Sequence, residues 1–364
     1  MSKNIIKPVI ADADAIARAA DLLRQGRLVA FPTETVYGLG ADASNPDAVA
    51  RIFKAKGRPA DHPLIVHIAT IDSLGDWAST VPDAALKLAD RFWPGPLAII
   101  LNKKPGVSLA VTGGQQTVGL RIPDHPVALA LLKSFGGGIA APSANRFCRI
   151  SPTLAAHVSE ELGDAIDMIL DGGACQVGVE STIIDLSGNR PRLLRPGHIT
   201  GQEIEAVLQT ELMTPPTSNA APDPDRLSAI TPALEIRAPG IMTVHYAPTT
   251  PAIRCPTEQL PDNIRQLIAD GKRIGLLSYQ LKIAETSQIR VLRLPEQAAR
   301  YAQSLYAALR ELDNLQLDMI LIEQPPQTEP WRAINDRLSK ATAPCSRFLP
   351  TPMQAKLPLN RLSF

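Results

Sequence analysis

The sequence has few aromatic residues and almost no net charge, and both features limit the partners that can be expected. Phe, Tyr and Trp make up 4% of the 364 residues, so aromatic platforms for single-stranded nucleic acid are not expected to be its main device. The 37 basic and 36 acidic residues leave a formal net charge of +1. The overall charge therefore favours no polyanionic partner, and only a local basic patch could bind one.

Cysteines and long apolar runs are also scarce. The four cysteines form no CxxC pair and match no zinc-binding spacing, which favours reduced thiols in a cytosolic protein without a metal site. The N-terminal segment lacks the basic and then apolar layout of a signal peptide. No apolar run approaches the roughly 20 residues that span a bilayer. We therefore expect a soluble, cytoplasmic protein with no membrane contact.

Two common catalytic motifs are missing. No GxxxxGK[ST] loop occurs in the sequence, which disfavours a P-loop ATPase. No GxSxG elbow occurs either, which disfavours a covalent serine hydrolase of that type. The chemistry is therefore expected to depend on positioning and charge rather than on a protein nucleophile.

Strand-like and helix-like segments alternate along residues 1–208 and predict an α/β domain with one core. Apolar runs typical of buried strands occur at residues 27–32, 63–69, 97–104, 117–123, 137–145, 167–173, 181–188 and 192–197. Segments with helical spacing occur at residues 12–26, 45–58, 83–93, 125–135 and 153–163. In the second of these helices, Asn45 is the expected N-cap and Pro46 lies in the first turn.

The composition changes after residue 208. Residues 209–250 are rich in Pro, Ser, Thr and Ala without a sustained period, which predicts a linker. Strand patterns then return at residues 273–279, 288–295 and 317–324, with helical patterns at 296–315 and 333–342. We expect residues 251–364 to form a smaller, Rossmann-like parallel α/β domain, although its GxGxxG turn is missing and no dinucleotide site is expected.

Polar motifs stand near several predicted strand or helix ends, where ligands of α/β sheets tend to bind. In PTETVYG, the hydroxyls of Thr33 and Thr35 can bind a ligand or can satisfy the backbone of their own turn. In KAKGRP, Lys56 and Arg58 can clamp phosphates or can simply compensate a helix dipole. In PLIVHIA, His67 lies in an apolar strand, where a lone histidine is usually structural. These residues alone leave the alternatives open.

Three further motifs add cations and hydroxyls. Arg121 follows an apolar strand and needs an anion, which can be Asp124 or a ligand carboxylate. The loop APSANRFCRISPT is rich in donors for phosphate or ribose oxygens, although one of its hydroxyls can instead cap the next helix. Ser181 and Arg195 again stand at strand edges.

Nine of these segments occur in a fixed order between Phe31 and Gly197: FPTETVYGLG, KAKGRP, HPLIVHI, WPGPLAIIL, TVGLRIPDHPVA, APSAN, SPT, GVESTIIDL and LLRPG. Together they resemble the YrdC/Sua5 family of threonylcarbamoyl-AMP synthases. The later APGIMTVHYAP resembles the linker of the longer, two-domain Sua5 members. The C-terminal α/β region fits their second domain by position and length.

The resemblance implies an open, twisted, mixed sheet with helices in the first domain. It implies a nucleotidyltransferase in which L-threonine, bicarbonate and ATP with Mg²⁺ give threonylcarbamoyl-AMP and pyrophosphate. It implies L-threonine binding by Thr33, His67, Arg121, Ala141 and Ser181. It implies ATP binding by Lys56, Arg58, Thr117, Ser143, Asn145, Ser151, Arg195 and Tyr246, with Tyr246 folding across the mouth of the site. The product would pass to a tRNA threonylcarbamoyl transferase complex, which modifies adenosine 37 to t⁶A.

One departure from the family pattern concerns Cys148, which stands where glycine is common. We expect its backbone to avoid angles that only glycine adopts, or the loop to shift. Two alternative functions remain open. A basic face that includes Arg146 and Arg149 could bind RNA as a module without ATP turnover. The domain could also belong to a hydrogenase maturation protein, although the zinc-finger and acylphosphatase regions of those proteins are not visible here.

Overall fold

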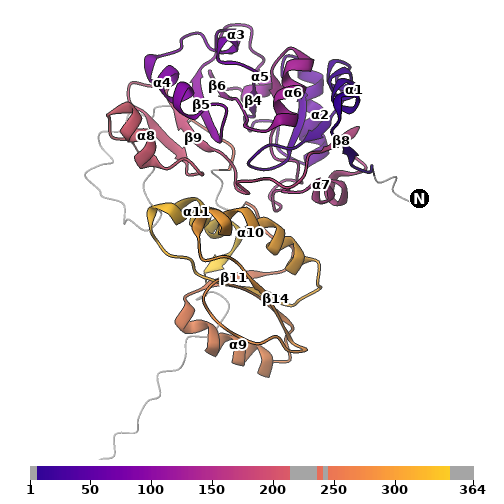
Figure 1. Cartoon of the computed structure of the whole chain (residues 1–364), viewed down its shortest axis with the longest axis vertical. Helices are drawn as coiled ribbons and strands as arrows, with labels where there is room; N and C mark the ends of the chain where they lie inside the picture. The colour runs from indigo at the N-terminus through magenta and orange to yellow at the C-terminus, as the bar shows by residue number, and fades with distance from the viewer. Residues whose placement is uncertain (1–5, 214–235, 241–244, 345–364) are drawn as a thin grey trace, which may run out of the picture.

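The computed structural model describes residues 6–213, 236–240 and 245–344. The chain folds into two α/β domains, each built on its own sheet (Figure 1). Much of the predicted linker, together with Cys345, lies outside the described residues. No helix in the described ranges is long and apolar enough to cross a bilayer.

A mixed sheet of ten strands forms the first domain, as predicted. Its strands are β1 (Val9–Ile10), β2 (Val29–Phe31), β3 (Gly38–Asp42), β4 (Ile65–His67), β5 (Leu97–Asn102), β6 (Thr117–Arg121), β7 (Ile139–Ala140), β8 (Met168–Asp171), β9 (Thr182–Asp185) and β10 (Arg192–Arg195). Their spatial order is β1-β8-β2-β3-β7-β4-β6-β5-β9-β10. Strands β4 and β6 run parallel, whereas β3 and β7 run antiparallel.

The sequence did not predict β1 and β3 as strands. The first has only two residues, and β3 contains two glycines and no β-branched residue, so it carries no strand signal. Gly40 is required by packing, because a Cβ there would lie 2.9 Å from the ring of Phe31 and 3.1 Å from the carbonyl oxygen of Val29. Tertiary packing therefore overrides the weak local preference of β3.

Helices cover both faces of this sheet. They are α1 (Ala13–Arg24), α2 (Pro46–Lys56), α3 (Leu74–Trp77), α4 (Asp83–Phe92), α5 (Leu109–Thr112), α6 (Pro126–Phe135), α7 (Ala155–Leu162) and α8 (Gly201–Leu208), and a 3₁₀ turn spans Ile71–Ser73. Helices α1 and α6 pack over one apolar core, and α2, α4, α7 and α8 pack over the other. Asn45 accepts hydrogen bonds from the backbone of Asp47 and Ala48, so it caps α2 as predicted.

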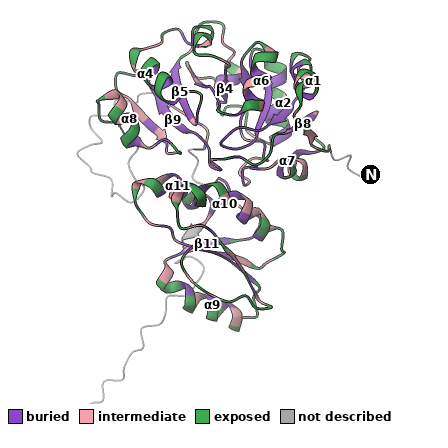
Figure 2. Cartoon of the chain, viewed as in Figure 1, coloured by how far each residue is buried: buried purple, intermediate pink, exposed green. Residues whose placement is uncertain are grey.

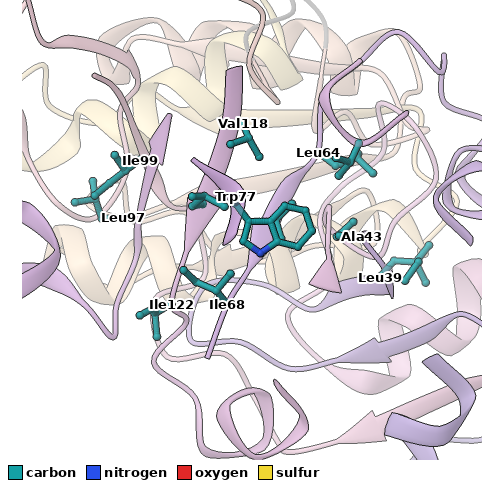
Figure 3. Close-up of a cluster of buried hydrophobic side chains, with 14 of the residues drawn as sticks. Leu39, Ala43, Leu64, Ile68, Trp77, Leu97, Ile99, Val118 and Ile122 are labelled. Atoms are coloured by element: carbon teal, nitrogen blue, oxygen red, sulfur yellow. The ribbon is translucent and has the colours of Figure 1, made fainter. Parts of the chain in front are cut away.

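The larger core is mainly aliphatic, and Figure 3 shows the part of it that surrounds Trp77. Trp77 packs against the backbone of Gly138, where an added Cβ would lie 2.3 Å from the indole ring. The burial pattern in Figure 2 shows the strands of the first domain buried between exposed helix faces. Buried strands of this kind give the fixed support that a precise binding site needs.

The second domain has a parallel sheet of five strands. They are β11 (Ala252–Cys255), β12 (Ile274–Ser278), β13 (Ile289–Arg293), β14 (Met319–Glu323) and β15 (Ala343–Pro344), in the order β13-β12-β14-β11-β15. The helices are α9 (Leu260–Ala269), α10 (Ala298–Asp313) and α11 (Arg332–Ala341), with 3₁₀ turns at Thr257–Gln259 and Glu329–Trp331. The parallel architecture is confirmed, while β11 and β15 were not predicted. Figure 1 shows α10 and α11 on the side that faces the first domain and α9 on the far side.

Candidate active site

A small cavity on one face of the ten-stranded sheet brings many of the predicted site residues together. Eight of the thirteen predicted residues line it: Arg58, His67, Arg121, Ala141, Ser143, Ser181, Arg195 and Tyr246. They come from the ends of β4, β6 and β10, from the turns around β7 and β9, from the segment after α2, and from the predicted linker. The fold therefore collects side chains that are far apart in the sequence.

His67 and Arg121 are cross-strand neighbours because they pair in the register of the parallel strands β4 and β6. Both ring nitrogens of His67 are buried and have no hydrogen-bond partner within the described residues. Burial, together with the charge of Arg121, holds the pKa of His67 well below its usual value. His67 is therefore a neutral imidazole that offers one donor and one acceptor to a ligand.

The anion beside Arg121 is Glu34, and not Asp124. Nη2 of Arg121 lies 2.6 Å from Oε1 of Glu34, and both side chains are buried. Nε donates to the carbonyl oxygen of Gly95, and Nη1 donates to Oγ1 of Thr35 at 3.0 Å. The guanidinium is therefore fixed by three contacts before any ligand arrives.

Three further cationic residues lie at or next to the cavity: Lys56, Arg58 and Arg195. Burial lowers the pKa of Arg195, and burial with the neighbouring Arg195 lowers that of Arg58 to about 10. Burial and Arg58 lower the pKa of Lys56 to about 7. Lys56 lies just behind the lining and donates through Nζ to the carbonyl oxygens of Ser143, at 2.5 Å, and Asn145. A nearby anion stabilises the charged form of groups whose pKa is lowered in this way, and a phosphate group is such an anion.

The remaining predicted residues do not line the cavity. Thr33 closes its own turn: Oγ1 donates to the carbonyl oxygen of Val36 and accepts from the backbone of Thr35 and Val36. The threonine of this motif that lines the cavity is Thr35. Thr117 begins β6 opposite Asn102 of β5. Direct contacts from Thr33 and Thr117 to substrate stay predictions without geometric support.

The loop after β7 contains the other two residues outside the lining. Asn145 donates to the backbone carbonyls of Arg146 and Arg149, so its amide shapes the loop. Cys148 has φ +64°, in the left-handed region that favours glycine but that other residues can also adopt. Ser151 donates to Oε1 of Glu180 at 2.5 Å, and this contact places its hydroxyl behind the cavity wall.

Four residues of the predicted linker line the cavity, which has a volume of about 50 Å³: Pro239, Gly240, His245 and Tyr246. Tyr246 is buried and stacks on Tyr306 of α10, with ring centroids 5.9 Å apart. The carbonyl oxygen of Pro239 accepts from Nη1 of Arg195, and that of Gly240 accepts from Nζ of Lys340. The cavity is far smaller than the roughly 300–1,000 Å³ that is typical of ligand pockets.

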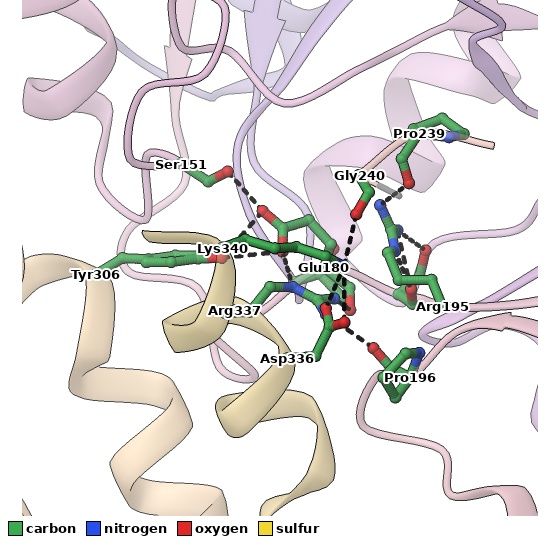
Figure 4. Close-up of polar contacts among 12 residues, drawn as sticks. Ser151, Glu180, Arg195, Pro196, Pro239, Gly240, Tyr306, Asp336, Arg337 and Lys340 are labelled. Carbon is green, nitrogen blue, oxygen red and sulfur yellow. Dashed lines mark hydrogen bonds and ion pairs between the residues drawn. The ribbon is translucent and has the colours of Figure 1, made fainter. Parts of the chain in front are cut away.

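Sequence reasoning did not predict Glu34 and Glu180 as residues of the site. Glu180 directly precedes Ser181 and lines the cavity. Burial acts to raise its pKa, but Arg337 and Arg195 hold the pKa near 2, so it is a buried carboxylate. Its charged partner Arg337 belongs to the second domain (Figure 4). No local pattern signals such a partner, because it lies 157 residues away in the sequence.

A larger cleft of about 800 Å³ lies elsewhere on the first domain. It is lined by residues such as Asp42, Trp77 and Gly138. Asp42 ends β3, whereas Gly38 at the start of the same strand bridges to Ser143 of the small cavity. None of the thirteen predicted residues lines this cleft, so size alone does not identify the site.

Comparisons with known proteins agree with this geometry. The family model named for Sua5, YciO and YrdC and described as telomere recombination matches residues 21–197. The model described as the C-terminal domain of threonylcarbamoyl-AMP synthase matches residues 199–343. The threonylcarbamoyl-AMP synthase of Bacillus subtilis is 44% identical over 333 residues, covering 90% of this chain and 92% of the relative.

The synthase of Pyrococcus abyssi is 42% identical and covers 89% of this chain and 93% of the relative. The crystal structure of P. abyssi Sua5 complexed with L-threonine superposes with a TM-score of 0.81 at 40% identity, covering 90% of this chain and 94% of that one. The chain therefore belongs to the YrdC/Sua5 family of threonylcarbamoyl-AMP synthases, in its longer, two-domain form.

Proposed function

We propose that the protein is an L-threonylcarbamoyladenylate synthase, a nucleotidyltransferase that condenses L-threonine, bicarbonate and ATP. The observation that carries this proposal is one cavity that collects two chemically different groups of residues. His67 and Arg121 suit a small amino acid, and Arg58 and Arg195 with Lys56 behind them suit phosphates. The L-threonine bound to the P. abyssi relative supports the first assignment.

The reaction needs no protein nucleophile. The amine of threonine takes up CO₂ derived from bicarbonate and becomes a carbamate. A carbamate oxygen then attacks the α-phosphorus of ATP, the bond to the β-phosphate oxygen breaks, and pyrophosphate leaves. The cations near the phosphates would neutralise the developing charge, and the buried walls would hold the reactants in line and exclude water.

We assign L-threonine to His67, Arg121, Ala141 and Ser181, with Thr35 in the place predicted for Thr33. The carboxylate would pair with Arg121, and hydrogen bonds to the threonine hydroxyl would reject analogues that lack it. ATP is assigned to the remaining predicted residues: Lys56, Arg58, Ser143, Asn145, Ser151, Arg195 and Tyr246, with Thr117 as a prediction from resemblance alone.

Mg²⁺ would arrive as the ATP complex, held by phosphate oxygens. No cluster of three potential metal ligands exists in the described part of the chain. The one carboxylate in the cavity lining, that of Glu180, is already engaged by Arg337 and Ser151. This donor set fits phosphates rather than a resident divalent cation, which prefers several oxygen ligands.

The division into a catalytic domain at residues 1–208, a linker at 209–250 and a second domain at 251–364 remains part of this proposal. The linker would close over the adenylate and protect it from water. The product would pass to a tRNA threonylcarbamoyl transferase complex in the cytoplasm, for t⁶A formation at adenosine 37. Weak RNA binding by the synthase itself would assist this transfer.

Pyrophosphate release with all substrates tests the function directly. We expect release from ATP and Mg²⁺ to require both L-threonine and bicarbonate, and serine to replace threonine poorly. Mass spectrometry of the mixture should show threonylcarbamoyl-AMP. Release that is independent of threonine and bicarbonate would contradict the proposal, and salt-sensitive RNA binding without any turnover would favour the RNA-binding alternative.

A further inference from the structure

Arg337 of α11 is the largest fully buried side chain of the described chain. Most of its contacts reach into the first domain (Figure 4). Nε donates to Oε2 of Glu180 at 2.7 Å, Nη2 donates to the carbonyl oxygen of Glu180, and Nη1 donates to that of Pro196 at 3.0 Å. Its guanidinium carbon also lies 5.3 Å from the ring centre of Tyr246.

These contacts hold two segments that form one wall of the cavity. Glu180 precedes Ser181, and Pro196 follows Arg195. Arg195 donates to both the carbonyl and the hydroxyl oxygen of Ser181, so the two segments are joined beside the cavity. They also approach closely, because a Cβ added at Gly197 would lie 2.3 Å from the backbone nitrogen of Thr182.

Glu180 connects Arg337 to Ser151 through hydrogen bonds. Oε1 of Glu180 accepts from Ser151 at 2.5 Å, and Oε2 accepts from Tyr306 at 3.1 Å as well as from Arg337. One guanidinium therefore reaches Ser151, Arg195 and Tyr246 through at most one intermediate residue. All three are residues that we assign to ATP, whereas only Ser181 on this wall is assigned to threonine.

Contacts other than this buried pair also join the two domains. Arg310 of α10 pairs with Glu161 of α7 at 2.6 Å, and Asp313 of α10 pairs with Arg149 at 3.0 Å. The apolar contacts of Tyr246 and Tyr306 add to them. A fully buried ion pair contributes little net stability compared with an apolar contact, so its presence at the cavity wall points to a role in orientation.

We propose that Arg337 is a positioning residue for nucleotide binding, by which the second domain sets the geometry of the ATP side of the cavity. The second domain is thus a working part of the site, although Arg337 itself does not touch substrate. The turnover measurement that tests this inference rests on the proposed function, whereas the binding measurement does not.

The test uses the full chain with Arg337→Lys and Arg337→Met. Lysine keeps the charge but cannot reproduce the three directed hydrogen bonds of the guanidinium fork. We expect Arg337→Lys to weaken binding of ATP with Mg²⁺ by at least about tenfold, the size of one charge-assisted hydrogen bond. L-Threonine affinity, measured by calorimetry in separate titrations, should change far less. In turnover, KM for ATP should rise more than KM for threonine.

Asp313→Asn is the matched control, because it removes a domain-to-domain ion pair without touching Glu180, Pro196 or Tyr246. It should leave both affinities unchanged. An unchanged ATP affinity in folded Arg337→Lys would overturn the proposal. So would an equal loss of ATP and threonine binding, or an equal effect of Asp313→Asn, since each indicates a purely structural contact.

The methionine variant removes the charge and leaves Glu180 unpaired. If it fails to fold, the lysine variant alone decides. The synthase function and the positioning role of Arg337 would fail in different experiments. Wild type that binds ATP and threonine but gives no threonine-dependent pyrophosphate would contradict the synthase function. A selective loss of ATP binding in Arg337→Lys would still support the positioning role.

Discussion

Arg121 and Glu34 form a buried ion pair, with Nη2 2.6 Å from Oε1 and side chains only 5% and 4% exposed. The pair is neutral as a whole, which permits its burial at the end of β6. Arg121 is also held by Gly95 and Thr35. A ligand carboxylate therefore meets a guanidinium that is already oriented, and it need not pay the entropy of ordering that side chain.

The pair predicts that Arg121 has two separable effects. Arg121→Gln should lower the free energy of unfolding by ~3–5 kcal/mol, because Glu34 is left as an unpaired buried carboxylate. It should also weaken L-threonine binding by about 10- to 100-fold, through loss of a charged hydrogen bond. Urea unfolding and calorimetry measure the two effects, and ATP affinity should survive.

The double variant Glu34→Gln/Arg121→Gln separates them. It removes both buried charges, so most of the stability should return. Threonine binding should stay weak, because the cation for its carboxylate is still missing. Recovery of threonine affinity together with stability would show that Arg121 acts only through the fold.

Tyr246→Phe tests whether the linker tyrosine reaches the nucleotide. The hydroxyl of Tyr246 is buried without a hydrogen-bond partner among the described residues, and burial raises its pKa to about 12, which keeps it a donor. Its removal should therefore leave the free energy of unfolding unchanged, or raise it by up to ~1 kcal/mol. ATP affinity should nevertheless fall by about five- to tenfold, through loss of one hydrogen bond.

Tyr306→Phe is the matched control for this prediction. Tyr306 stacks on Tyr246, but its hydroxyl donates to Glu180 at 3.1 Å. This variant should therefore lose ~1.5–3 kcal/mol of stability, because the bond is made to a charged group, in contrast to Tyr246→Phe. Thermal unfolding distinguishes the two, and an unchanged ATP affinity in Tyr246→Phe would remove the nucleotide contact from the proposal.

The regular elements were predictable where their sequences carry a period. The spacing of apolar residues at 12–26 and 296–315 gave α1 and α10, and Asn45 gave the start of α2. Strand β3 was not predicted, because it contains two glycines and packing requires the one at Gly40. Strand β11 lies between Pro251 and Pro256, next to the Pro-rich segment, and its four residues are too few to show alternation.

The site was predictable as a group of motifs but not in its detailed contacts. The carboxyl ends of neighbouring parallel strands lie at the same edge of a sheet, so the polar residues that end β4 and β6 could be expected to lie close together. Which threonine of PTETVYG lines the cavity depends on the turn itself, because the hydroxyl of Thr33 donates to the backbone of that turn. Arg121 pairs with Glu34 and Glu180 pairs with Arg337. The spacing of charges along the sequence does not reveal such pairs.

Cys148 offers a test of local strain. It adopts φ +64°, a region that costs a non-glycine residue roughly 1–2 kcal/mol. Cys148→Gly should relieve this cost, although the freer unfolded chain offsets about 0.4–1 kcal/mol of the gain. We expect a net rise in the free energy of unfolding of up to ~1 kcal/mol, measured in urea. Cys148→Ala keeps the strain and should give no rise, and an equal rise in both variants would contradict this explanation.

Lys56 makes ATP binding dependent on pH. Burial and Arg58 lower its pKa to about 7 in the free protein, so above pH 7 it is mostly neutral until a phosphate arrives. The phosphate charge raises that pKa again, so binding of Mg²⁺-ATP between pH 7 and 9 should take up as much as one proton. Affinity should therefore fall with rising pH, by at most about tenfold per unit.

Calorimetry in buffers of different ionisation enthalpy measures the proton uptake. The uptake should vanish in Lys56→Gln but persist in Lys54→Gln, because Lys54 is an exposed lysine of the same helix. Proton uptake that is unchanged in Lys56→Gln would place the titrating group elsewhere.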